Sequence, residues 1–257
     1  MSFTNKVVLI TGASSGIGAA CALRFAKSSA TLVLVGRNHD NLIKIAHQCE
    51  KLNHIKPLLV VADITSENDI DKIVKETIKK HTKIDVLINN AGVNSVSGAH
   101  TPVEAYDRVM TTNLRGTYLL TTKLAPYLIK TKGNIVNISS ILSNKPLPLM
   151  TPYCMSKAAL DMFTKCTALQ LGPKGVRVNA VNPGPVKTEL FRRGGMSDTD
   201  CDRMFSGIEM STPLRKITKG EDVAELVMFL ASDRASCING SCYVIDCGLT
   251  LGEAANL

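Results

Sequence analysis

The chain of 257 residues contains no tryptophan, and aromatic residues make up only 4% of it. Any hydrophobic core must therefore be aliphatic. No apolar run approaches the roughly 18 residues that a membrane-spanning helix needs, so we expect no membrane span. The first apolar segment begins at about Lys6, and we expect no secretory leader ahead of it.

The eight cysteines include no C-x-x-C pair, and no cysteine and histidine spacing matches a zinc site. We therefore predict no metal site, reduced thiols and a cytoplasmic location. The last three residues, Ala255, Asn256 and Leu257, distantly resemble the Ser-Lys-Leu peroxisomal address without its basic middle residue. A peroxisomal location stays a minor alternative.

Acidic residues are the less abundant charge, since 30 lysines and arginines face 22 aspartates and glutamates for a net charge of +8. The basic residues are scattered along the chain, which indicates a solvated surface rather than a nucleic-acid-binding site. The same balance would attract an anionic cofactor.

Short β-branched runs alternate with longer amphipathic segments along the whole chain. This alternation predicts βαβ units, and strands without polar alternation are typical of a parallel sheet buried on both faces. We therefore expect a single α/β domain over residues 1–257, a Rossmann-like, doubly wound sheet flanked by helices. Its expected strands are Val7–Ile10, Thr31–Val35, Pro57–Val61, Val86–Ile88, Asn134–Ile138, Arg177–Val181 and Cys242–Ile245.

A glycine-rich turn, "TGASSGIG" from Thr11 to Gly18, lies between the first strand and the first helix. Glycines at 12, 16 and 18 let the backbone approach a ligand closely, and the helix N-terminus favours a pyrophosphate. Strand, glycine turn and helix in this order predict a dinucleotide-binding site.

Tyr153 and Lys157 are four residues apart in "YCMSK", and "NISS" ends at Ser140. On a helix, this step places both side chains on one face. An adjacent ammonium favours the phenolate, so we expect Lys157 to lower the pKa of Tyr153. A tyrosine of this kind can exchange a proton with a substrate oxygen.

Together these segments resemble the short-chain dehydrogenase/reductase family, from Lys6 to about Gly248. The further motifs are Asp63 in "VVADIT", "NNAG" ending at Gly92, Asn113 in "TTNLRG" and "VNPGPVKTEL" from Val181. Cys247 departs from the pattern, because the family has glycine there. The resemblance implies a cofactor half at about 1–135 and a catalytic and substrate-lid half at about 136–257.

The resemblance also implies roles for individual residues. The catalytic set would be Asn113, Ser140, Tyr153 and Lys157. The unpatterned stretch from Pro183 to about Lys219 would form the substrate lid, and Leu142, Leu147, Pro148 and Met150 would face the substrate. The cofactor would contact Gly12, Ser14, Ser15, Gly16, Ile17, Gly18, Arg37, Asn38, Asp63, Ile64, Asn90, Ala91, Gly92, Tyr153, Lys157, Pro183, Gly184, Val186 and Thr188.

The end of the second strand, "LVLVGRN", predicts the choice of cofactor. A site selective for NAD has an acidic residue there for the ribose 2′-hydroxyl, and this chain has Gly36. Arg37 follows, and its planar fork suits a 2′-phosphate. Ser14 could add a hydrogen bond. We therefore expect NADP(H).

The residues and the resemblance favour an NADP(H)-dependent oxidoreductase that interconverts a ketone or aldehyde with an alcohol. Enoyl reductases of related fold separate the tyrosine and lysine by six residues, whereas three separate them here. The expected substrate is a small apolar carbonyl compound or alcohol, such as a steroid, retinoid, isoprenoid, quinone or acyl thioester. The family also implies a homotetramer. A non-catalytic binding or scaffold protein on the same fold is the alternative.

Overall fold

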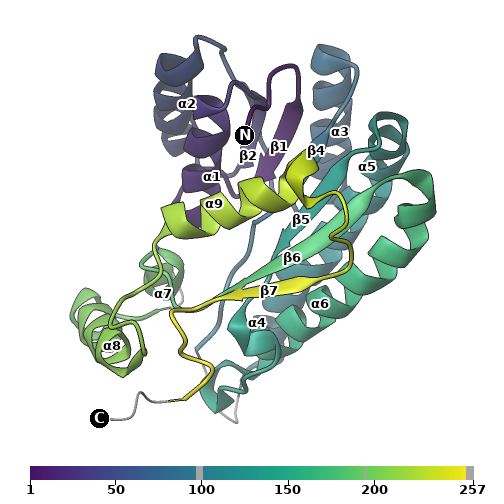
Figure 1. The fold of residues 1–257 in the computed structure, drawn as a ribbon. Coiled ribbons are helices and arrows are strands. Elements are labelled where there is room, and N and C mark those ends of the chain that lie inside the picture. Colours follow the sequence, from purple (N-terminus) through teal and green to yellow (C-terminus); the bar gives the residue numbers. More distant parts are fainter. Residues whose placement is uncertain (97–100, 194, 253–257) are drawn as a thin grey trace.

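The computed structural model describes residues 1–96, 101–193 and 195–252. Within these residues the chain forms a parallel sheet of seven strands (Figure 1). Its order is β3-β2-β1-β4-β5-β6-β7. Every strand lies where the sequence predicts it, with ends that differ by at most two residues. The strands are β1 (Val7–Thr11), β2 (Thr31–Gly36), β3 (Leu58–Val61), β4 (Val86–Asn89), β5 (Asn134–Ile138), β6 (Arg177–Pro183) and β7 (Cys242–Ile245).

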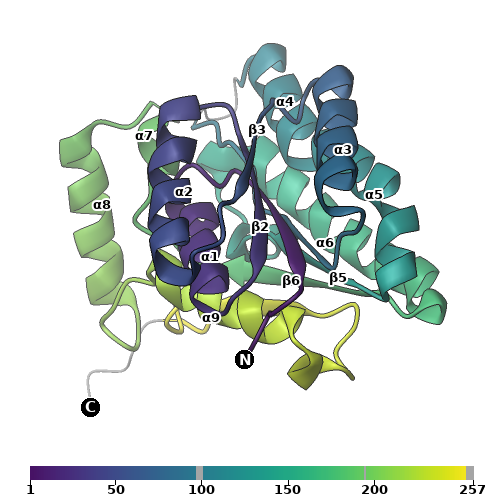
Figure 2. The same cartoon turned by 90° about the horizontal axis from the view of Figure 1, so that it is seen from above.

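Helices cover both faces of the sheet, as Figure 2 shows from above. One face carries α1 (Gly16–Lys27), α2 (His39–Asn53) and α9 (Gly220–Ala231), and the other carries α3 (Glu67–His81), α5 (Thr117–Thr131) and α6 (Thr151–Leu171). Successive strand side chains alternate between these faces, so Val8 and Ile10 pack on the first and Val7 and Leu9 on the second. The aliphatic core is therefore split into two layers by the sheet.

The contact between α1 and α9 joins the two ends of the chain. A Cβ atom on Gly220 would lie 3.3 Å from the Cβ atom of Ala20, so the helices approach closely. Arg24 of α1 forms an ion pair with Glu225 of α9. Residues from the proposed cofactor and catalytic halves therefore pack in the same hydrophobic layer on this face of the sheet.

Cys247, the departure from the family pattern, lies just after β7 in a left-handed conformation with φ of +56°. This region of backbone space favours glycine, which explains the family preference. The Cys247 sulfur lies 3.6 Å from the hydroxyl of Thr218. The C-terminal turn thus forms without glycine at this position.

The stretch from Pro183 to Lys219 is not unpatterned, which corrects the sequence prediction. It contains α7 (Leu190–Arg193) and α8 (Asp198–Ser211). The side chain of Ser197 accepts a hydrogen bond from the backbone nitrogen of Asp200 and so caps α8. Phe191 of α7 packs edge-on against Phe205 of α8, with ring centroids 5.7 Å apart.

Candidate active site

A cavity of about 810 Å³ runs along the carboxyl ends of the strands. Its size is typical of a site for a small molecule or cofactor. The strand order reverses between β1 and β4, where open parallel sheets bind their ligands. All the cofactor and catalytic residues predicted from the sequence line this cavity, except Gly18 and Asn113.

The glycine turn forms the floor of the cofactor end. Gly12 and Gly16 have φ angles of +65° and +55°, which explains why both are glycine. A Cβ atom on Gly18 would lie 2.3 Å from the carbonyl oxygen of Gly12, so the turn is too tight for any side chain there. Gly18 therefore shapes the turn from behind and does not line the cavity.

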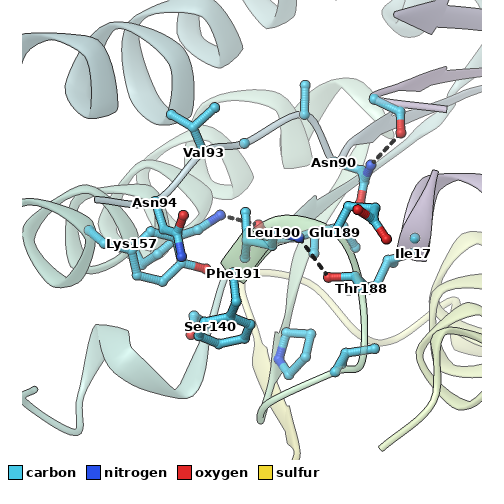
Figure 3. Close-up of a pocket in the computed structure, with 18 of the residues that line it drawn as sticks. Ile17, Asn90, Val93, Asn94, Ser140, Lys157, Thr188, Glu189, Leu190 and Phe191 are labelled. Atoms are coloured by element: carbon cyan, nitrogen blue, oxygen red, sulfur yellow. Dashed lines mark hydrogen bonds between the residues drawn. The ribbon is translucent and has the colours of Figure 1, made fainter. Parts of the chain in front are cut away.

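The turn after β4 is bonded to the glycine turn. The hydroxyl of Thr11 accepts hydrogen bonds from the backbone nitrogens of Asn90 and Ala91, both at 3.0 Å. The Asn90 carboxamide donates to the carbonyl oxygens of Thr11 at 2.9 Å and Gly12 at 3.2 Å. Figure 3 shows Asn90, Ile17 and Thr188 together at this end. The cradle left open by the glycines fits a dinucleotide pyrophosphate.

The ends of β2 and β3 carry a pair of opposite charges. Arg37 donates from Nη1 to Oδ2 of Asp63 at 3.4 Å, and both side chains line the cavity. Burial tends to raise the pKa of Asp63, but hydrogen bonds from Thr65 and the charge of Arg37 outweigh it and hold that pKa below its usual value. Asn38, beside them, caps α2 through its side-chain oxygen.

Asn113 lies in a π-helical segment, Thr111–Gly116, between α4 (Val103–Met110) and α5. Its Oδ1 accepts from the backbone nitrogen of Val93 at 2.8 Å, and its Nδ2 donates to the Val93 carbonyl oxygen at 2.9 Å and to Ser156 Oγ at 3.0 Å. Asn113 therefore fixes the chain after β4 against α6, one layer behind the cavity wall. A widened helical turn of this kind is frequent at functional sites.

Ser140, Tyr153 and Lys157 meet at the centre of the cavity lining. Ser140 follows β5, and the other two lie on one face of α6. The Lys157 ammonium donates to the carbonyl oxygen of Ile138 at 2.7 Å and lies 5.5 Å from the centroid of the Tyr153 ring. All three side chains are buried, with no more than 7% of any residue exposed.

The expectation that Lys157 lowers the pKa of Tyr153 is wrong for this structure. Burial raises the pKa of Tyr153 to about 12, opposed by a hydrogen bond with Ser140. Burial also lowers the pKa of Lys157 to about 8, opposed by the charge of Asp161. For both groups, desolvation of the charged form is the largest cause of the shift in pKa. At neutral pH, Tyr153 is thus a phenol that holds its proton.

Asp161 and Asn182 form a buried support that the sequence did not reveal. The Asn182 carboxamide donates to Asp161 Oδ2 at 2.8 Å, to Ser143 Oγ at 2.9 Å and to the Ser140 carbonyl oxygen at 3.1 Å. This network holds the chain that carries Ser140 against α6. Asp161 is one helical turn beyond Lys157, and that spacing is the only sequence signal for it.

The other end of the cavity is lined mostly by apolar side chains, several of them from α7 and α8. Leu142, Leu147 and Met150 line it as predicted, but Pro148 does not. Figure 3 shows Phe191 beside Ser140 at this end. Leu190, Phe191, Met204 and Ile208 also line it, and they belong to the stretch from Pro183 to about Lys219 that the resemblance assigned to the lid. Asn94 and Arg108 line the cavity without having been singled out from the sequence.

Other expectations concern metals, membranes and targeting. Among the described residues, no three His, Cys, Asp or Glu side chains gather in a way that could hold a metal ion. Within the same residues, no helix is long and apolar enough to cross a bilayer. All eight cysteines are free. Ala255, Asn256 and Leu257 lie outside the described residues.

Comparisons of sequence agree over nearly the whole chain. A family model described as enoyl-(acyl carrier protein) reductase matches residues 12–250. The 3-oxoacyl-[acyl-carrier-protein] reductase FabG of Thermotoga maritima is 35% identical over 254 residues, which are 98% of this chain and 100% of that protein. The L-xylulose reductase of Caenorhabditis elegans is 37% identical over 258 residues, covering 96% of this chain and 97% of that protein.

Solved structures share the fold at similar coverage. A short-chain dehydrogenase/reductase of unknown function from C. elegans, crystallised with cofactor, has a TM-score of 0.93 and 34% identity over 98% of this chain and 97% of that one. A 7α-hydroxysteroid dehydrogenase complexed with NADH and 7-oxo glycochenodeoxycholic acid has a TM-score of 0.90 and 28% identity, covering 96% and 95%. The L-sorbose reductase of Gluconobacter frateurii, complexed with NADPH and L-sorbose, has a TM-score of 0.90 and 30% identity, covering 97% and 98%.

The fold and the cavity are those of a nicotinamide-dependent oxidoreductase. With matches of this length, the chain belongs to the short-chain dehydrogenase/reductase family, whose members use NAD(H) or NADP(H).

Proposed function

We propose that this protein interconverts a ketone or aldehyde with an alcohol, with Tyr153 as the acid/base residue. The observation that carries the proposal is the buried group of Ser140, Tyr153 and Lys157, which shares one cavity with the glycine turn. A catalytic acid must lie where substrate and cofactor meet. The three-residue gap between Tyr153 and Lys157 favours carbonyl over enoyl reduction.

Each residue has a stated task in this proposal. The bound nicotinamide supplies or accepts hydride at the reacting carbon. The Tyr153 phenol donates its proton to the carbonyl oxygen, and the Ser140 hydroxyl stabilises the negative charge that develops there. Lys157, and the cofactor contacts predicted from the sequence, hold the cofactor. Asn113 acts through Val93, whose backbone it holds with two hydrogen bonds.

The finer features of the proposal are an apolar substrate and NADP(H). The aliphatic and aromatic side chains at the substrate end support the first, and Arg37 beside Gly36 supports the second. We place the enzyme in the cytoplasm, because its eight free cysteines suit a reducing compartment.

A homotetramer is the proposed assembly. Several large apolar side chains are exposed on the outer surface of α4, α5 and α6. They include Val103 at 68%, Tyr118 at 51%, Met162 at 57% and Leu169 at 79%. Exposed apolar side chains that gather on neighbouring helices mark an interaction surface, and closed symmetry is usual for soluble oligomers.

The test of the function is Tyr153→Phe, assayed by nicotinamide absorbance with a panel of ketones. We expect a loss of about 10²- to 10⁴-fold in turnover, the usual contribution of a general acid, with cofactor affinity close to that of wild type. Tyr127→Phe is the matched control, because Tyr127 lies on α5 outside the cavity. A Tyr153→Phe enzyme with most of its activity would end the assignment, and wild-type protein that binds cofactor without turnover would favour the non-catalytic alternative.

A further inference from the structure

The backbone around Asn94 is held firmly beside the catalytic group. Val93 is bonded through both its nitrogen and its carbonyl oxygen to Asn113, and Arg108 donates from Nη2 to the Asn94 carbonyl oxygen at 3.1 Å. Val93 also packs against the buried cluster that contains Tyr153 and Met150. A side chain at position 94 is therefore placed by a fixed backbone rather than by a free loop.

The Asn94 side chain has an unsatisfied donor. The residue is only 1% exposed, and its Nδ2 is buried without a hydrogen-bond partner. Asn94 lines the cavity, and Figure 3 shows its carboxamide turned into the space between Lys157 and Ser140. A buried donor without a partner is costly, and buried polar groups are nearly always paired.

Asn94 is unusual even among the unsatisfied groups of this protein. The other buried side-chain atoms without a partner in the described residues belong to Arg24, His81, Asn89, Asn134, Asp161 and Asn182. None of those residues lines the cavity. The unsatisfied donor of Asn94 is thus the one that a substrate could reach and pair.

We propose that Asn94 is a specificity residue that donates a hydrogen bond to a second oxygen of the substrate. This rests on the proposed function and names its substrate class. Asn94 lies beside Ser140 and Lys157 in the cavity lining, close to where the reacting carbonyl would be bound (Figure 3). We therefore place the second oxygen on a carbon adjacent to the reacting carbonyl. The substrate is then an α-hydroxy or α-oxo ketone in reduction, and a vicinal diol or hydroxy ketone in oxidation. The rest of its body lies against the apolar wall of Leu142, Met150 and Phe191.

The test compares two ketones of nearly equal shape, 1-hydroxyoctan-2-one and nonan-3-one, in which a methyl group replaces the hydroxyl. Wild-type enzyme should reduce the hydroxy ketone with a kcat/KM at least tenfold higher. Asn94→Leu and Asn94→Ala, neither of which carries a side-chain donor, should bring the ratio of the two kcat/KM values to about one. Asn68→Leu, on the exposed surface of α3, should leave the ratio unchanged.

A second measurement separates recognition from a structural role. Replacing an unpartnered donor by an apolar group should leave the Tm of Asn94→Leu equal to or above that of wild type. A wild-type ratio near one, a ratio that survives both substitutions, or a lowered Tm with equal losses on both ketones would overturn the role of Asn94 alone. Wild-type enzyme that reduces neither these ketones nor the wider panel would overturn the proposed function as well.

Discussion

Removing the Arg37 guanidinium should weaken NADPH far more than NADH. Arg37 follows Gly36 at the end of β2, lines the cavity, and has 64% of its side chain exposed. Its pair with Asp63 is also partly exposed, and such pairs contribute only about 0–1 kcal/mol. The guanidinium can therefore turn to a phosphate at little cost. A charge-assisted hydrogen bond contributes about 1.5–3 kcal/mol, which corresponds to roughly 10- to 150-fold in affinity.

Gly36→Asp should reverse the preference. A Cβ atom on Gly36 would lie 3.4 Å from Ser14 Oγ and 3.5 Å from Leu42 Cδ2, and the backbone there does not require glycine. The carboxylate is therefore tolerated sterically. It would repel a 2′-phosphate and accept a hydrogen bond from a 2′-hydroxyl.

The assay is kcat/KM for NADPH and for NADH at a saturating ketone concentration and fixed ionic strength. Arg115→Ala is the matched control, because Arg115 forms a similarly exposed ion pair, with Glu67, outside the cavity. Equal use of both cofactors by wild type would refute the reasoning, and so would an Arg37→Ala variant that weakens both equally.

Three further predictions follow from pKa, packing and exposure. Lys157 has a pKa of about 8 and is charged below that pH, so kcat/KM for reduction should fall about tenfold per pH unit above pH 8. Asp161→Asn removes the charge that raises this pKa, so the fall in kcat/KM should begin at lower pH. A fall that begins at the same pH in the variant would contradict this. Gly18→Ala should weaken cofactor binding at least tenfold in calorimetry and lower the free energy of unfolding by about 1–3 kcal/mol, because the new Cβ would lie 2.3 Å from the Gly12 carbonyl oxygen. Gly207→Ala in α8 is the control and should change neither quantity, because nothing lies within 4 Å of its Cβ position. Light scattering should report a tetramer for wild type and smaller species for Leu169→Glu; a wild-type monomer at working concentration would refute the proposed assembly.

The strands could be predicted because the five inner strands are buried almost throughout, and their β-branched runs therefore lack polar alternation. The edge strands β3 and β7 are partly exposed, but they keep β-branched residues. The glycine turn could also be predicted from the sequence. Its positive φ angles at Gly12 and Gly16, and the neighbouring atoms that a Cβ on Gly12 or Gly18 would meet, allow few other residues there. The helices α7 and α8 were missed because their sequence is polar and lacks a clear periodic face. The Ser197 cap with Asp200 three residues later was the available signal.

Two properties of the site could not be predicted from the sequence, because they depend on burial by residues distant in the chain: the pKa of Tyr153 and the unpaired donor of Asn94. The pKa of Tyr153 was predicted in the wrong direction because the spacing shows the neighbouring ammonium but not the desolvation of both groups. Asn94 is one of many asparagines in the sequence. It stands out only when the partners of every other buried donor are known.

The packing of α9 on α1 has a consequence for synthesis on the ribosome. The face of α1 that includes Ala20 is buried by α9, so it stays exposed until the residues near Gly220 have been synthesised. At about 5–20 residues per second, roughly 190 residues of elongation separate the two helices by about 10–40 s. During that interval, β1, β2 and α1 exist with one apolar side uncovered. Nascent chains stalled before Gly220 should therefore be good chaperone substrates, and the fold should become protease-resistant only once α9 has emerged.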